Sequence, residues 1–207
     1  MNLGIATPVS LHRLRSLVED GDKLPQGYLF APAADWVMEL MERGHQVTLY
    51  TTAREIDSPT TFCGNGLRIR IAKLRACGTG RDFFRSERDQ LTRMMIEDRC
   101  DLIHAHWTYE FALAAIASRI PTLSTIHDHP WTVLSHFRDG HRAARLLMAY
   151  ATAFRGSHFT AVSAGAALHF QRFIRPGIPI DVVPNGLPSG IFALGCRSRC
   201  ETGDAVR

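Results

Sequence analysis

Short apolar runs alternate with longer amphipathic stretches along the whole chain. We interpret the runs as strands over residues 3–9, 46–52, 67–72, 101–106, 121–127, 158–163 and 180–184. Several of these runs are apolar on both faces, as strands of a sheet covered on both sides must be. Strands that alternate with helices are typical of βαβ units. The pattern therefore predicts a Rossmann-like, doubly wound α/β fold with a predominantly parallel sheet of about six or seven strands.

The stretches between the runs have helical spacing. After the first strand, apolar residues recur at intervals of three and four positions, at Ala33, Trp36, Val37, Leu40 and Met41. Gly44 follows as the expected left-handed end of this helix. Similar spacing predicts helices around residues 91–95, 108–120, 143–154 and 166–173. Ser86 and Ser163 are candidate amino-terminal caps, because a serine oxygen can accept a backbone hydrogen bond there.

The connection between the first strand and the first helix, residues 8–27, is longer than an ordinary βα loop. It follows the carboxyl end of a strand, where open α/β sheets bind their ligands. Gly27 precedes the helix, so backbone N–H groups and the helix dipole would favour an anion there. A plain turn glycine explains Gly27 equally well, because glycine is the usual residue at positive φ.

Histidines gather at the ends of two successive predicted strands. Strand alternation places His104 and His106 on one face, and His127 ends the next strand. Two neighbouring parallel strands would bring these imidazoles to one rim of the sheet. An imidazole there could donate to a sugar hydroxyl group or stabilise charge on a leaving phosphate. His104 lies deeper in its strand, so we interpret it as structural.

Paired histidines at strand ends can also bind zinc or iron, so a metal-dependent hydrolase is an alternative function. Such a site needs further ligands, usually including a carboxylate. Asp128 and Asp139 are nearby in the sequence, but neither follows the end of another predicted strand. We therefore expect no catalytic metal and no bound cofactor.

Composition narrows the function classes. The 24 basic and 20 acidic residues are interspersed, so the net charge of +4 forms no block that would favour nucleic acid. The five cysteines are odd in number and lack zinc-site spacing, which favours a reducing, cytoplasmic location. The apolar run at the start is too short for a signal peptide or a membrane span. Any contact with the inner face of the membrane would therefore be peripheral.

Four segments together resemble a known family. They are Thr7-Pro8 at the end of the first strand, residues 42–48 at the end of the first helix, residues 101–107 with 125–127, and residues 160–163 with 182–186. In this order and spacing the chain resembles the amino-terminal domain of the family 4 retaining glycosyltransferases, which have the two-domain GT-B architecture. The resemblance extends over residues 3–187.

This resemblance implies transfer of a sugar from a nucleotide-sugar donor to a hydroxyl group of a carbohydrate, lipid or other acceptor, with retention of configuration. It assigns to Gly27 a place against the donor phosphates and the acceptor. It assigns to His127 a contact with the transferred sugar at the reaction centre, and to His106 a place near the acceptor. The loop has Gln26-Gly27 where many members have two glycines.

The resemblance also divides the chain. Residues 1–188 correspond to the amino-terminal, acceptor-side domain, whereas residues 189–207 have no apolar periodicity and are expected to form an irregular tail. The domain that grips the donor in the family is expected to be absent, so the isolated chain is expected to be inactive. An interface left open could support self-association. A non-catalytic module that binds an acceptor or a partner is the other alternative.

Overall fold

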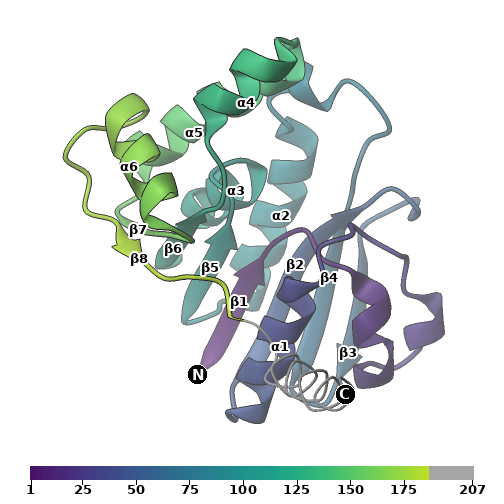
Figure 1. Cartoon of the computed structure of the whole chain (residues 1–207). Coiled ribbons are helices and arrows are strands. Elements are labelled where there is room, and N and C mark those ends of the chain that lie inside the picture. The colour runs from purple at the N-terminus through teal and green to yellow at the C-terminus, as the bar shows by residue number, and fades with distance from the viewer. Residues whose placement is uncertain (187–207) are drawn as a thin grey trace, which may run out of the picture.

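A computed structural model describes residues 1–186, and the predicted tail, residues 189–207, lies outside the described residues. Within residues 1–186, eight strands form one sheet in the order β3-β4-β2-β1-β5-β6-β7-β8 (Figure 1). Their bounds are β1 Asn2–Ala6, β2 Gln46–Ala53, β3 Thr60–Gly64, β4 Leu67–Lys73, β5 Leu102–His106, β6 Thr122–Ile126, β7 His158–Ala161 and β8 Asp181–Val182. Among these eight strands, only β3 is antiparallel to its neighbour. The predicted α/β class with a predominantly parallel sheet is confirmed.

Helices cover both faces of the sheet, as the doubly wound prediction requires. They are α1 Pro32–Glu42, α2 Arg85–Asp98, α3 Glu110–Ser118, α4 Pro130–Phe137, α5 Gly140–Arg155 and α6 Ala164–Phe173, with 3-10 helices η1 Leu11–Leu17, η2 Gly21–Lys23 and η3 Thr79–Asp82. Ile5 of β1 packs in the core beside α1, whereas Ala6 packs in the core beside α2 and α3. Successive residues of β1 therefore face opposite layers.

Two of the predicted helix ends are confirmed and one is wrong. Gly44 follows α1 with φ of 81°, the left-handed conformation expected there. Ser163 Oγ accepts from the Ala166 amide at 3.1 Å and caps α6. Ser86 does not cap α2, because the helix begins at Arg85 after Phe84, whose φ is 57°. The chain leaves η3 through a left-handed turn and enters α2 before Ser86 is reached.

The structure adds elements that the sequence pattern did not predict. β3 lies at the sheet edge and carries two exposed or half-buried threonines at its start, so it lacks an apolar run. α4 is short and mostly exposed. In α5 the apolar spacing overestimates burial, because Leu147 and Phe154 remain 54% and 67% exposed. The apolar stripe of α5 is wider than the surface that the sheet and its neighbours cover.

The long connection after β1 folds over the edge where the parallel strands end. The Tyr28 amide donates to the Val9 carbonyl at 2.9 Å, and the Leu11 amide donates to the Gln26 carbonyl at 3.1 Å. These bonds join the two ends of the connection in a short antiparallel bridge. Among the helices of residues 1–186, none is both long and apolar enough to cross a membrane.

Candidate functional site

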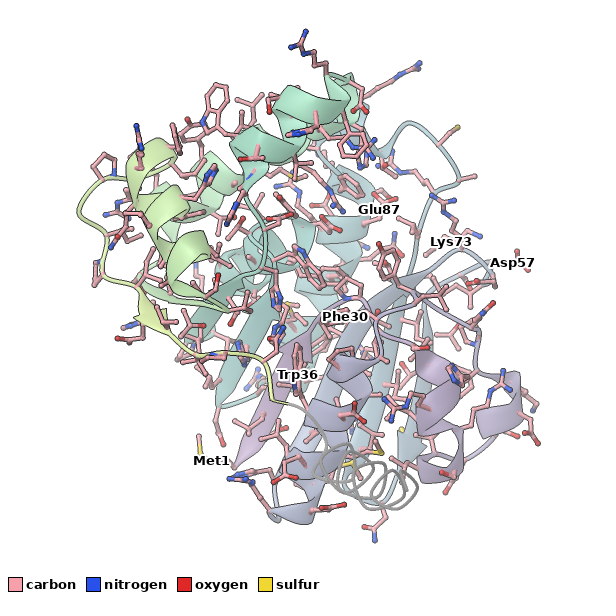
Figure 2. The ribbon with its side chains drawn as sticks, in the orientation of Figure 1. Met1, Phe30, Trp36, Asp57, Lys73 and Glu87 are labelled. Atoms are coloured by element: carbon pink, nitrogen blue, oxygen red, sulfur yellow. The ribbon has the colours of Figure 1, made fainter. Side chains whose placement is uncertain are left out.

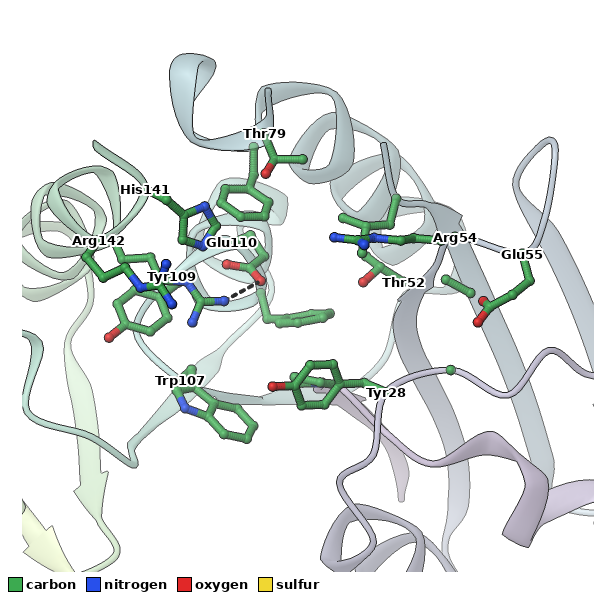
Figure 3. Close-up of a pocket in the computed structure, with 17 residues that line it drawn as sticks. Tyr28, Thr52, Arg54, Glu55, Thr79, Trp107, Tyr109, Glu110, His141 and Arg142 are labelled. Atoms are coloured by element: carbon green, nitrogen blue, oxygen red, sulfur yellow. Dashed lines mark ion pairs between the residues drawn. The ribbon is translucent and has the colours of Figure 1, made fainter. Parts of the chain in front are cut away.

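A cavity of 510 Å³ opens at the edge where the parallel strands end. Pro8 follows β1, Thr52 lies near the end of β2 and Trp107 follows β5, and all three line it. Thr79 of η3 and His141 at the start of α5 close it from the other side (Figure 3). This edge is where ligands bind in open α/β sheets, and small-molecule sites span about 300–1,000 Å³.

Aromatic side chains form much of the cavity wall. Trp107 and Tyr28 lie along one side of it in Figure 3, and Tyr109 lies beside Trp107. Trp107 has φ of 64°, which a bulky side chain rarely adopts. This turn ends β5 and lets α3 begin at Glu110. Backbone strain of this kind is concentrated at functional sites, so the outlier supports a ligand site at this position.

Charged side chains line the same cavity. We call Arg54, Arg142 and Arg145 the cavity cations; Glu55 and Glu110 are the carboxylates among the lining residues. Figure 3 shows Arg54 and Arg142 on opposite sides, with Glu110 between them. The excess of positive over negative side chains favours an anionic ligand, because the walls concentrate the field within the cavity.

Glu110 is a buried carboxyl group without its full complement of hydrogen bonds. Its side chain is 10% exposed, and the Oε1 atom is 3.7 Å from Arg145 Nη2, too far for a hydrogen bond. Oε2 has no hydrogen-bond partner within residues 1–186. Burial raises the pKa of Glu110, while the charge of Arg145 opposes that shift. The cavity wall therefore contains an acceptor oxygen that lacks a donor.

The neighbours of Glu110 are held firmly. The Tyr109 hydroxyl group donates to the Asp128 carboxylate, with oxygen distances of 2.8 and 2.9 Å. The Arg145 guanidinium lies 4.7 Å from the centre of the Tyr109 ring, a cation–π distance. Burial raises the pKa of Asp128, and the hydrogen bond from Tyr109 opposes that effect. These contacts fix the wall around Glu110 before any ligand arrives.

A second polar group lies next to the cavity: the imidazole cluster of His104, His106 and His127. His106 Nδ1 is 2.9 Å from His127 Nε2, so one nitrogen donates to the other. His104 Nε2 is 2.6 Å from Thr125 Oγ1. Trp36 of α1 stacks on His106 with 4.3 Å between ring centres. Figure 2 shows Trp36 close to Phe30, whose ring it contacts edge-on.

The imidazole cluster is neutral near pH 7. Burial lowers the pKa of His104 to about 4. Burial, with a smaller contribution from the charge of His104, also lowers the pKa of His127 to about 4. Burial lowers the pKa of His106 well below its usual value, and the neighbouring histidines add to this effect. Each ring therefore carries a single N–H, which limits the hydrogen bonds it can donate.

The structure brings the three predicted site residues close to the same edge but gives them different environments. Gly27 lines the cavity. His127 does not line it, but its ring stacks on Trp107 with 4.5 Å between centres, and Trp107 does line it. His106 is 4% exposed and does not line the cavity, but it forms a hydrogen bond with His127. Ligand contacts by His106 and His127 remain predictions.

Gly27 has a structural reason to be glycine. Its φ is 71°, and a Cβ atom there would lie 2.6 Å from the Val9 carbonyl oxygen. The turn interpretation of Gly27 is therefore sufficient to explain the residue. Its position on the cavity wall leaves a role in phosphate or acceptor binding as a prediction.

The metal alternative finds no ligand set in the described part of the chain. Within residues 1–186 no group of three or more histidine, cysteine, aspartate or glutamate side chains is arranged to hold an ion. His106 and His127 use one nitrogen each on their mutual hydrogen bond. A metal-dependent hydrolase therefore has no structural support in these residues.

Sequence reasoning missed the charged residues of the cavity. Arg54 follows the end of β2, and Glu110 begins α3 shortly after β5. Their positions after parallel strands were a usable signal, because such loops form ligand sites. His141 and Arg142 begin α5 and had no such signal. They reach the cavity only because α5 packs beside α3 and η3.

Residues 33–189 match the sequence profile of Glycosyltransferase Family 4. No curated protein matches the chain. Among solved structures, the chain is similar to sucrose-phosphate synthase from Thermosynechococcus elongatus, with a TM-score of 0.63 and 12% identity over 90% of this chain and 48% of that one. It is also similar to UDP-GlcNAc 2-epimerase from Neisseria meningitidis, with a TM-score of 0.55 and 11% identity over 98% of this chain and 52% of that one.

At these identities the solved structures support the fold alone. The arrangement of helices on both faces of a mainly parallel sheet is shared with these Rossmann-like proteins. The chain spans about half the length of each matched structure.

Proposed function

The chain belongs to glycosyltransferase family 4, and from that premise we propose that residues 1–186 form the domain that presents an acceptor hydroxyl group to a nucleotide-sugar donor. Transfer would retain the configuration of the sugar and use no resident metal or cofactor. The observation that carries the proposal is the cavity at the carboxyl edge of the sheet. Its walls include Gly27, to which the family resemblance gives a place against the donor phosphates and the acceptor, and Trp107, which contacts His127.

His127 is the proposed catalytic residue. Its Nε2 atom is engaged with His106, so Nδ1 is the ring nitrogen left for the transferred sugar. When His106 donates from Nδ1, His127 Nδ1 carries the proton and can donate to a sugar oxygen. A pKa of about 4 keeps this imidazole neutral, so its role is positioning and hydrogen bonding. His106 is the proposed substrate-side partner that selects the tautomer of His127.

The direct test is an assay of sugar transfer by the purified chain. UDP-GlcNAc is a suitable first donor because the epimerase structure was determined with that nucleotide sugar. We propose that this domain alone transfers no measurable sugar, since the family resemblance assigns the groups that neutralise the donor diphosphate to the second domain of the GT-B architecture. Turnover that disappears in His127→Ala would contradict this proposed inactivity while supporting the role of His127.

A binding experiment tests the acceptor-side role even if the chain transfers no sugar. Ligand-detected NMR with a panel of saccharides should show binding that Tyr28→Ala weakens. Tyr28 lines the cavity and is 61% exposed, so its replacement leaves the fold intact. Leu29→Ala is the matched control, because Leu29 is exposed but does not line the cavity. No binding by any saccharide would contradict a carbohydrate acceptor.

The non-catalytic alternative predicts a different result. A pure binding module would bind its saccharide or partner with no transfer even when a donor-binding domain of the family is added. We further propose a cytoplasmic location, with any membrane contact peripheral, and self-association of the chain. Light scattering measures the last point directly, and a single monomeric species would contradict it.

A further inference from the structure

The cavity next to the proposed reaction centre is lined by a carboxyl group with an acceptor oxygen that nothing in the described chain satisfies. Oε2 of Glu110 is buried, carries no hydrogen bond within residues 1–186, and belongs to a side chain that lines the cavity. Leaving a buried acceptor unpaired is unfavourable, so such atoms need an explanation in terms of a ligand or function. A ligand that donates a hydrogen bond at this wall would remove the penalty.

The donor on that ligand is better supplied by a hydroxyl group than by an ammonium group. Arg145 is 3.7 Å from the Glu110 carboxyl group, and Arg54 and Arg142 stand on the two sides of the cavity. Three positive charges around one partly compensated carboxyl group repel a cation. A hydroxyl group donates to Glu110 without that repulsion.

The arginines of the cavity favour a ligand that also carries a negatively charged group. Arg142 is paired with Asp139 at 2.8 Å, but Arg54 has no ion pair with any side chain of residues 1–186. The Arg145 guanidinium stacks on Tyr109, and its Nε atom has no hydrogen-bond partner in the same part of the chain. Arg54 and Arg145 therefore keep donors available for phosphate or carboxylate oxygens, which guanidinium groups bind well.

Aromatic side chains in the cavity wall favour a sugar ring. Trp107 and Tyr28 present flat apolar surfaces along one side of the cavity, as Figure 3 shows. A sugar ring has an apolar C–H face that can pack on such surfaces, while its hydroxyl groups point outward to polar partners. The cavity thus offers apolar, hydroxyl-accepting and anion-binding surfaces in one space of 510 Å³.

We propose that this cavity takes an anionic sugar, a monosaccharide carrying a phosphate or carboxylate group, with Glu110 accepting a hydrogen bond from a ring hydroxyl and with Arg54 and Arg145 holding the anion. This inference rests on the proposed function, because the anionic sugar would be the acceptor. Glu110 is thereby assigned as a specificity-determining residue of the acceptor site.

The test is calorimetric titration of the whole chain with matched sets of ligands. Each set contains a neutral hexose, its 6-phosphate and its uronic acid, for glucose, galactose and mannose; inorganic phosphate and UDP are titrated separately. At least one anionic sugar should bind about tenfold more tightly than its neutral counterpart. The phosphate and uronate arms distinguish the two sources of negative charge. Equal affinity across every set, or no binding in any, would overturn the proposal.

Variants identify the groups responsible. Glu110→Leu removes the acceptor oxygen and should weaken the anionic sugar about tenfold while leaving inorganic phosphate unchanged. Glu110→Gln keeps one carbonyl oxygen and should restore part of the loss. Arg54→Met should reduce the preference for the anionic sugar. Arg81→Met is the matched control for Arg54→Met, because Arg81 does not line the cavity, and it should leave the preference unchanged.

The outcomes separate this inference from the proposed function. Wild-type affinity in Glu110→Leu would overturn the inference, whatever the transfer assay gives. UDP that binds through Arg54 while no anionic sugar binds would assign the cations to the donor and also overturn it. Saccharide binding that is insensitive to charge would leave the acceptor-side function in place and remove only the anionic class.

Discussion

The imidazole cluster and the Glu110 wall of the cavity lie at the same edge of the sheet, but they differ in how their polar atoms are satisfied. In the cluster, His106 and His127 bond to each other and His104 bonds to Thr125. At the wall, Oε2 of Glu110 bonds to nothing within the described chain. Hydrogen bonds within the cluster stabilise the fold, whereas a buried acceptor without a donor costs stability unless a ligand supplies one.

This difference suggests a division of work. The cluster forms a rigid, neutral support under Trp107, because its rings stack and bond among themselves. The wall keeps its donor and acceptor capacity for a ligand. Three measurements of stability test this difference, because the imidazole cluster should contribute to the free energy of unfolding and the Glu110 wall should not.

The largest expected effect is acid destabilisation through the cluster. His104 and His127 keep a folded pKa of about 4, below the unfolded value of about 6.5. Between these values the unfolded chain binds protons that the folded chain excludes, so stability is full above pH 6.5 and is lost as pH falls towards 4. Two histidines give a slope of up to about 3 kcal/mol per pH unit.

Urea unfolding at several pH values measures this slope. Glu110 and Asp128 have raised pKa values and act in the opposite sense, since protons bind to their folded forms first. The double variant His104→Gln/His127→Gln lacks the two titrating imidazoles. Its stability should therefore fall less steeply between pH 6.5 and pH 4. An unchanged slope in that variant would show that the cluster is not the source of acid sensitivity.

The second effect is the loss of one ring from the cluster. His106→Ala removes a buried imidazole that stacks on Trp36 and bonds to His127, leaving a cavity and an unpaired nitrogen. The free energy of unfolding should fall by about 3 kcal/mol. His136→Ala is the control, because His136 is exposed on α4 and should change stability by less than about 0.5 kcal/mol. Similar losses in both variants would contradict a supporting role for the cluster.

The cluster could be predicted from the sequence and the wall could not, for physical reasons. The alternation of β5 placed His104 and His106 on one face, and the parallel neighbour β6 brought His127 beside them. Local period and strand order were sufficient. Glu110 and Arg145 meet only through the packing of α3 against α5, and nothing in local spacing encodes that contact.

The fold follows the same rule. Strands with a continuous apolar run were predicted because burial on both faces leaves a local signature. β3 was not, because Thr60 and Thr61 occupy an edge position that pairs on one side only. The Ser86 cap failed because left-handed residues before α2 moved its start.

The smallest expected change in stability comes from substituting Glu110 in the cavity wall. This substitution tests directly whether the wall differs from the imidazole cluster. Glu110→Leu replaces a buried carboxyl group that has no hydrogen bond on Oε2 with an apolar side chain of similar size. Arg145 loses a partner but remains 36% exposed, so water can solvate its charge. The free energy of unfolding at pH 7 should be unchanged or rise by up to about 1 kcal/mol.

Glu87→Leu is the contrasting variant, because Glu87 is fully buried and accepts two side-chain hydrogen bonds from Arg75. That change should cost about 3 kcal/mol. Equal losses in the two variants, measured by urea unfolding, would mean that Glu110 holds the fold together, and the wall would then resemble the cluster.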